Sequence, residues 1–166
     1  MTRRVLVAGV GNIFLSDDGF GVEVIRHVLG RELPAGVEVM DVGIRGIHLA
    51  YELMEGYDTL IVVDAVPRDF EPGTVFLLEP ERDEPARRAA EAIGEGARPL
   101  VDAHGMEPAS MLASLDLLGG DVERILVVGC QPLDVSEGIG LTPPVEAAVP
   151  GAVEMVMDVI ERESAA

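Results

Sequence analysis

Three side chains of this 166-residue chain have the types and surroundings needed for metal-assisted chemistry. Asp18 follows an apolar stretch and the pattern Gly-x-Gly-Asn, Asp64 ends the apolar run Thr-Leu-Ile-Val-Val, and His104 stands in Asp-Ala-His-Gly. Two carboxylates and one imidazole suit a transition metal, and zinc, nickel, manganese and iron all fit this donor set. The spacing of helical zinc proteases, with two histidines four residues apart, is absent.

Each of these residues also has a purely structural interpretation. Asp17 and Asp18 are neighbours, so one of them can cap the first helix while the other points into a crevice, and spacing does not say which. Asp64 is followed by Ala-Val-Pro and no clear helix, which makes a capping role less favoured. The other two histidines fall on polar or mid-helix positions, so His104 is the strongest imidazole candidate.

Other common reaction types find little support in the sequence. Phe14 occupies the position where a dinucleotide fingerprint needs its third glycine, and the chain contains no lysine for a phosphate loop or a Schiff base. Ser16 does not stand in a Gly-x-Ser-x-Gly elbow. Cys130, the single cysteine, is interpreted as a small buried thiol, and it leaves no intrachain disulfide.

The candidate residues fall at the ends of expected strands. Apolar runs predict strands at 4–10, 37–42, 59–63, 74–78 and 125–129, and periodicity predicts helices at 18–29, 47–54 and 107–118. The final helix is carried by Val153, Val156, Val159 and Ile160, and Pro150 either starts it or kinks it. Residues 79–98 are expected to form a surface excursion before 100–104 return to the sheet region. This order predicts an α/β fold, a three-layer α/β/α sandwich with a mostly parallel twisted sheet. Residues 74–78 are expected to form its antiparallel edge strand.

Composition restricts the function classes. The formal net charge of −18 argues against nucleic-acid partners, which require basic surfaces. The length and the 48% hydrophobic content suit one domain over residues 1–166. The first apolar run is too short for a signal peptide or a membrane span, so we expect a cytoplasmic protein without membrane contact.

Taken together, several motifs resemble the hydrogenase maturation endopeptidases, which process the large subunit of [NiFe] hydrogenases. The resemblance covers essentially the whole chain. It implies a phosphorylase/hydrolase-like fold. Its markers are Gly9-x-Gly-Asn-x-x-x-x-Asp17-Asp18-Gly-x-Gly21, Asp41-x-Gly43, Val63-Asp64-Ala65, His104 and Val128-Gly129-x-x-Pro132.

The resemblance implies roles for particular residues. Asp18, Asp64 and His104 match the family's metal-binding and catalytic positions, although the first position is often Glu in that family. Asp102, two residues before His104, can orient or supplement it. The turn with Asp41, Gly43 and Ile44 corresponds to the region implicated in substrate selection, where Thr is common in place of Ile44.

The implied activity is a single cut near the C-terminus of a hydrogenase large-subunit precursor after nickel insertion. The nickel is expected to be supplied by the precursor, which is also the expected partner. A monomer that docks transiently is the expected state.

Two other functions remain open at this point. A non-catalytic nickel-binding or scaffolding protein would use the same fold and the same ligands. A peptidyl-tRNA hydrolase-like enzyme is suggested by Gly9-Val10-Gly11-Asn12, but Ile13 replaces the expected proline and the net charge is hostile to tRNA.

Overall fold

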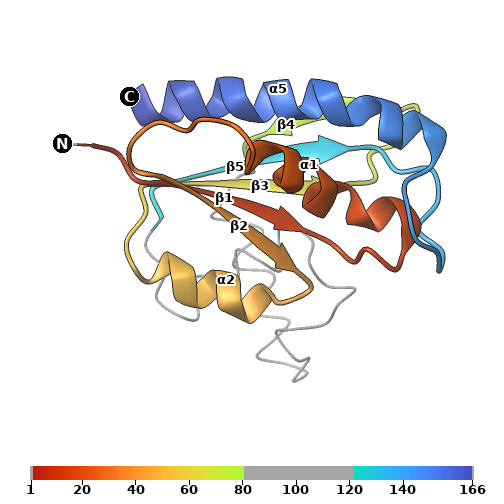
Figure 1. Ribbon diagram of the computed structural model, residues 1–166, viewed down its shortest axis with the longest axis horizontal. Coiled ribbons are helices and arrows are strands. Elements are labelled where there is room, and N and C mark those ends of the chain that lie inside the picture. Colours follow the sequence, from red (N-terminus) through yellow and green to blue (C-terminus); the bar gives the residue numbers. More distant parts are fainter. Residues whose placement is uncertain (1, 81–121, 166) are drawn as a thin grey trace.

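The computed structural model describes residues 2–80 and 122–165, and this part of the chain contains one five-stranded sheet. The strand order is β2-β1-β3-β5-β4; the first four strands are parallel and β4 is antiparallel to β5 (Figure 1). The elements in chain order are β1 (Val5–Val10), the 3₁₀ helix η1 (Ser16–Gly19), α1 (Phe20–Val28), β2 (Val37–Gly43), α2 (Gly46–Leu53), β3 (Thr59–Ala65), β4 (Val75–Leu78), β5 (Arg124–Cys130) and α5 (Pro143–Ala165).

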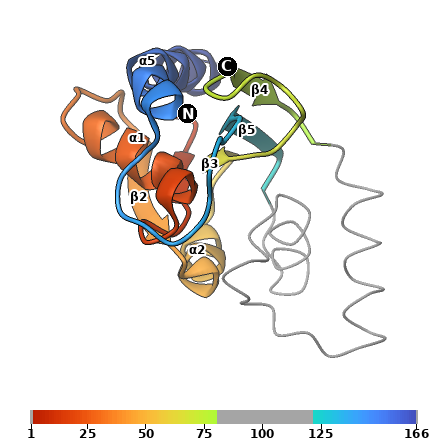
Figure 2. The same ribbon diagram turned by 90° about the vertical axis from the view of Figure 1, so that its right-hand side faces the viewer.

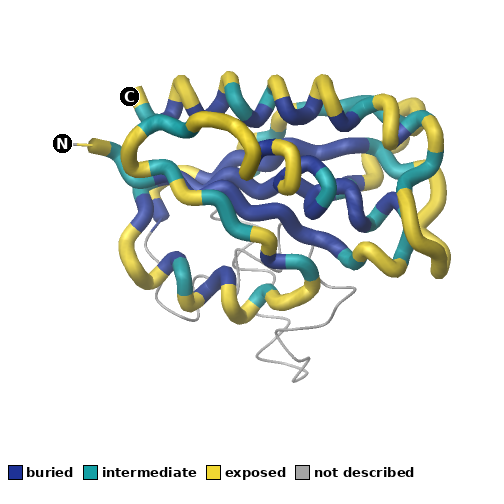
Figure 3. The backbone as a smooth tube through the Cα atoms, viewed as in Figure 1, coloured by how far each residue is buried: buried dark blue, intermediate teal, exposed yellow. Residues whose placement is uncertain are grey.

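Helices cover both faces of the sheet, with α1 and α5 on one face and α2 on the other (Figures 1 and 2). Successive side chains of β1 alternate between two cores, because Val5 and Val7 pack with α1 and α5 whereas Leu6 and Ala8 pack with α2. All of β1 is therefore buried (Figure 3), which explains its unbroken apolar sequence. The predicted three-layer α/β/α fold with an antiparallel edge strand is confirmed.

Two glycines let α1 lie directly on the sheet. A Cβ atom on Gly21 would overlap the carbonyl oxygens of Val63 and Val10, which belong to β3 and β1. A Cβ atom on Gly9 would overlap the side chain of Ile25. This close approach fixes the start of α1, and with it η1, above the carboxyl ends of β1 and β3.

Two helix boundaries differ from the predicted ones. The helix predicted over 18–29 is divided into η1 and α1, so Asp18 lies in the 3₁₀ turn. The last helix begins at Pro143, and the expectation that Pro150 starts it is wrong because Pro150 lies inside α5. Prolines at 143 and 144 fit the first turn of a helix, where an N–H group has no helical acceptor.

Several predicted features fall outside the described residues. These are most of the excursion at 79–98, the return at 100–104 and the helix at 107–118. Within residues 2–80 and 122–165, no helix combines the length and the apolar character that crossing a bilayer requires.

Candidate active site

Asp64 is a buried carboxylate at the carboxyl end of β3. The residue is 6% exposed, and its Oδ1 atom has no hydrogen-bond partner in the part of the chain that the structure describes. Burial raises the pKa of Asp64 well above its ordinary value, the nearby Asp18 carboxylate raises it further, and a hydrogen bond from the Ala65 N–H opposes both. A buried carboxylate with an unbonded oxygen is costly unless a cation or a donor approaches it. Asp64 therefore marks the candidate reactive centre.

Asp18, in the 3₁₀ turn η1 that follows β1, is the carboxylate whose charge acts on Asp64. Its Oδ2 accepts a hydrogen bond of 2.8 Å from the Asn12 N–H. Gly11 lies between the two acids, with φ of +136°. A Cβ atom on Gly11 would overlap the Asp18 carbonyl oxygen and lie 3.6 Å from Asp64 Oδ1. A glycine is thus required at the turn that brings Asp18 and Asp64 together, and two adjacent carboxylates favour a cation.

Asp17 has a different role from its neighbour. It is fully buried, and its carboxylate accepts hydrogen bonds from the backbone N–H groups of Leu133, Asp134 and Thr142 and from the Thr142 hydroxyl. Burial alone would raise the pKa of Asp17, but these hydrogen bonds outweigh it and hold the pKa below its ordinary value. The expectation that one of the two acids caps the first helix is wrong, because neither η1 nor α1 has a side-chain cap.

The loop over residues 131–142, which follows β5, clamps η1 in place. Leu15 and Gly138 form an isolated bridge, in which the Ser16 N–H donates to the Gly138 carbonyl and the Gly138 N–H donates to the Phe14 carbonyl. The Ser16 hydroxyl donates to the Ser136 carbonyl at 2.8 Å. The position of Asp18 therefore depends on a segment more than 110 residues further along the chain.

Replacing Asp17 by Ala is expected to lower the free energy of unfolding by about 3 kcal/mol, because three backbone N–H groups lose the buried carboxylate that accepts their hydrogen bonds. Urea unfolding of Asp17→Ala beside Asp158→Ala, at an exposed position of α5, measures this effect. Since the pKa of Asp17 is depressed, its contribution is present above the ordinary pKa and disappears as the pH falls through the folded-state pKa. A loss no larger than that of Asp158→Ala would contradict the clamping role.

The turn after β2, which is predicted to select the substrate, borders the loop after β1. Asp41 is exposed on β2, and Ile44, just after the strand, is 45% exposed. Gly43 adopts φ of +58°, and its carbonyl accepts a 3.0 Å hydrogen bond from the Gly11 N–H. The turn is thus anchored beside the glycine that separates the two reactive acids.

The predicted third ligand cannot be placed beside these acids, because His104 and its neighbour Asp102 lie outside the described residues. Among residues 2–80 and 122–165, no group of three or more His, Cys, Asp or Glu side chains is arranged to hold a metal. The described chain brings Asp18 and Asp64 together, and the imidazole stays a prediction from the sequence.

Cys130, interpreted from the sequence as a small buried thiol, is buried at the end of β5. Burial raises the pKa of its thiol to about 11, and the charge of Asp17 contributes to the shift. A thiol held protonated in this way is a poor nucleophile, which agrees with the structural interpretation.

Comparisons with known proteins agree on one family. The model of the hydrogenase maturation protease family matches residues 22–159, a stretch that includes Asp64 and begins after Asp18. The hydrogenase 2 maturation protease of Escherichia coli strain K12 is 35% identical over 163 residues, covering 97% of this chain and 92% of the relative. Hydrogenase expression/formation protein HupD of Rhizobium leguminosarum bv. viciae is 33% identical over 159 residues, covering 95% and 74%.

A solved structure extends the likeness to the fold. The hydrogenase maturating endopeptidase HybD from Escherichia coli superposes with a TM-score of 0.72 at 30% identity, covering 96% of this chain and 93% of that one. The chain therefore belongs to the hydrogenase maturation protease family, and its activity is that of a hydrogenase maturation endopeptidase.

Proposed function

We propose that the chain removes the C-terminal extension of a [NiFe] hydrogenase large-subunit precursor after nickel has been inserted. Asp18, Asp64 and His104 engage the nickel that the precursor carries. The metal is thus part of the substrate, and its arrival in the site reports that the precursor is ready to be cut.

One observation carries this proposal: the buried Asp64 carboxylate keeps Oδ1 without a hydrogen-bond partner among the described residues and lies near Asp18. Two carboxylates in a poorly hydrated place repel each other, and a divalent cation relieves both the repulsion and the lost hydration. A carboxylate pair completed by an imidazole suits nickel, and it leaves coordination positions for the substrate.

Bound nickel would supply Lewis-acid polarisation of the scissile carbonyl or of a water molecule. The chain's own residues prepare the place where this happens. Gly11 and the Asn12 N–H set the position of Asp18, and the end of β3 sets that of Asp64. The hydrogen bonds of Asp17 keep the whole turn rigid, so the carboxylates are preorganised before the precursor docks.

The exposed turn after β2 is proposed to contact the precursor beside the cut. Replacing Ile44 by Asp, or Asp41 by Ala, is expected to raise KM for the precursor about tenfold with little change in kcat, since each side chain contributes contact but no chemistry. Steady-state processing assays measure this, with Met54→Asp, at the exposed residue directly after α2, as control. Loss of kcat at unchanged KM would instead place the turn in the reacting centre.

The proposed setting is the cytoplasm, where a monomer meets the precursor transiently. The net charge of −18 favours docking to a positively charged segment of the partner. Family membership favours an endopeptidase over the scaffolding and peptidyl-tRNA hydrolase alternatives.

Turnover tests the proposal against a scaffolding role. One molecule of the chain is mixed with many molecules of a nickel-loaded large-subunit precursor, and the fraction of shortened precursor is followed by mass spectrometry. The proposal predicts that most of the precursor is shortened, so each molecule of the chain acts repeatedly. A stable one-to-one complex without shortened product would contradict it.

A further inference from the structure

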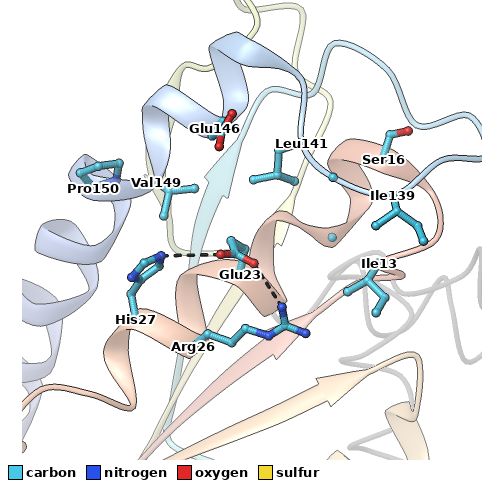
Figure 4. Close-up of a pocket in the computed structure, with 12 residues that line it drawn as sticks. Ile13, Ser16, Glu23, Arg26, His27, Ile139, Leu141, Glu146, Val149 and Pro150 are labelled. Carbon is cyan, nitrogen blue, oxygen red and sulfur yellow. Dashed lines mark hydrogen bonds and ion pairs between the residues drawn. The ribbon is translucent and has the colours of Figure 1, made fainter.

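A cavity of about 410 Å³, here called the α1–α5 cavity, opens between α1, η1 and the segment 139–150 (Figure 4). Its apolar wall consists of Ile13, Ile139, Leu141, Val149 and Pro150. A cavity of this size falls within the range of about 300–1,000 Å³ that is usual for ligand pockets, and it can accept large side chains of a bound peptide.

Two aliphatic side chains of the apolar wall are exposed to water. Ile139 is 82% exposed and Ile13 is 38% exposed, although both are large aliphatic residues. Clustered apolar side chains around a hollow mark sites of interaction more often than isolated ones do. An occupant with a large aliphatic side chain would remove this wall from water.

The polar side of the cavity carries a carboxylate that is not neutralised. Glu23 interacts with Arg26 at 3.4 Å and with His27 at 3.6 Å, as Figure 4 shows. Glu146, in the first turn of α5, forms no ion pair or side-chain hydrogen bond with another residue of the described chain. Because Glu23 balances the charge of Arg26, the α1–α5 cavity keeps one unpaired negative charge. Charge complementarity therefore favours a cationic occupant.

The α1–α5 cavity borders the turn that carries Asp18. Ile13 and Gly19 line it, and they belong to the loop and 3₁₀ turn that also carry Asp18. Neither Asp18 nor Asp64 is among the residues that line the cavity. Binding in the cavity can thus align a substrate chain without touching the reacting atoms.

We propose that the α1–α5 cavity is a second recognition site for the hydrogenase precursor, which takes a large aliphatic side chain adjacent to an arginine or lysine. Ile139 contacts the aliphatic side chain and Glu146 pairs with the cation. This inference rests on the proposed function and adds the chemistry of the segment that is recognised.

Matched pairs of variants test the two contacts in the processing assay. Ile139→Asp is compared with Leu29→Asp, another exposed aliphatic position, and Glu146→Arg with Glu161→Arg, another exposed acid of α5. The proposal predicts a KM raised about tenfold for Ile139→Asp and Glu146→Arg, with kcat and the thermal midpoint unchanged, and no change for the controls. Unchanged KM for both cavity variants would overturn it.

A peptide-binding experiment distinguishes a failure of the cavity proposal from a failure of the proposed function. The methyl NMR signals of Ile139 and Val149 are followed while the peptide Ac-Ser-Gly-Leu-Arg-Gly-Ser-NH2 is added, and then while versions with Ala for Leu or Glu for Arg are added. Shifts that weaken at least about fivefold with either change support the cavity proposal, even if the chain cuts no precursor. Normal processing without such shifts overturns the cavity proposal and leaves the proposed function intact. Self-association of the chain that Ile139→Asp abolishes would assign the cavity to a second copy and also overturn it.

Discussion

Replacing Asp64 by Asn is expected to lower processing of the nickel-loaded precursor by at least about 10³-fold, because the substitution removes a charge that the reacting centre requires. The same change is expected to stabilise the fold by about 1 kcal/mol at pH 8, because it removes a buried carboxylate whose Oδ1 lacks a partner among the described residues. Activity and stability thus move in opposite directions. Processing assays and urea unfolding of Asp64→Asn measure both, with Asp158→Asn on the exposed side of α5 as control.

The pH dependence of this stabilisation has a definite sign. Burial and Asp18 raise the pKa of Asp64 in the folded chain, so the protonated form is favoured by folding. The contribution of Asp64 to stability is therefore fully present below its ordinary pKa and is lost as the pH rises through the folded-state pKa. The difference in unfolding free energy between Asp64→Asn and the parent should widen from about pH 4 upward and level off above the folded-state pKa. A variant that is less stable than its parent at pH 8 would contradict this account of Asp64.

Replacing Gly21 by Ala is expected to lower the free energy of unfolding by at least about 3 kcal/mol and to abolish processing. The added Cβ would overlap two backbone carbonyl oxygens, those of Val63 and Val10, which cannot rotate away as a side chain can. Helix α1 must then move off the sheet, and η1 with Asp18 moves with it. The loss of stability and the loss of activity therefore have one cause.

Gly151→Ala is the matched control, because Gly151 also lies in a helix but a Cβ atom there would meet nothing within 4 Å. That substitution is expected to raise the unfolding free energy by about 0.5–1 kcal/mol, since alanine has the higher helix propensity. Urea unfolding and processing assays on both variants compare the two positions. Equal stability of Gly21→Ala and Gly151→Ala would show that α1 does not depend on this close contact.

The layers of the fold could be predicted because local patterns carry the information. The unbroken apolar sequence of β1 reflects burial on both faces, and the short connection before β4 leaves no room for a crossover helix. The extent of α5 could not be predicted in the same way. Pro150 was expected to start or kink a helix, yet the prolines at 143 and 144 already suit the first turn and Pro150 is tolerated inside.

The site is predictable only in part, because its geometry depends on contacts distant in sequence. The ends of β1 and β3 place Asp18 and Asp64 at one rim, as a parallel sheet requires. The separate role of Asp17 depends on Leu133 and Thr142, and no local pattern relates them to position 17. The α1–α5 cavity was not anticipated for the same reason, since Ile139 reaches it through the long loop after β5.

The most direct test compares a nickel-loaded hydrogenase large-subunit precursor with the nickel-free form. Each is incubated with catalytic amounts of the chain and weighed by intact-mass spectrometry. The nickel-loaded precursor alone is expected to lose a short C-terminal peptide, and the Asp64→Asn variant is expected to cause no such loss. Equal trimming of both precursors, or trimming that survives Asp64→Asn, would contradict the claim that the carboxylates of Asp18 and Asp64 act through the nickel of the substrate.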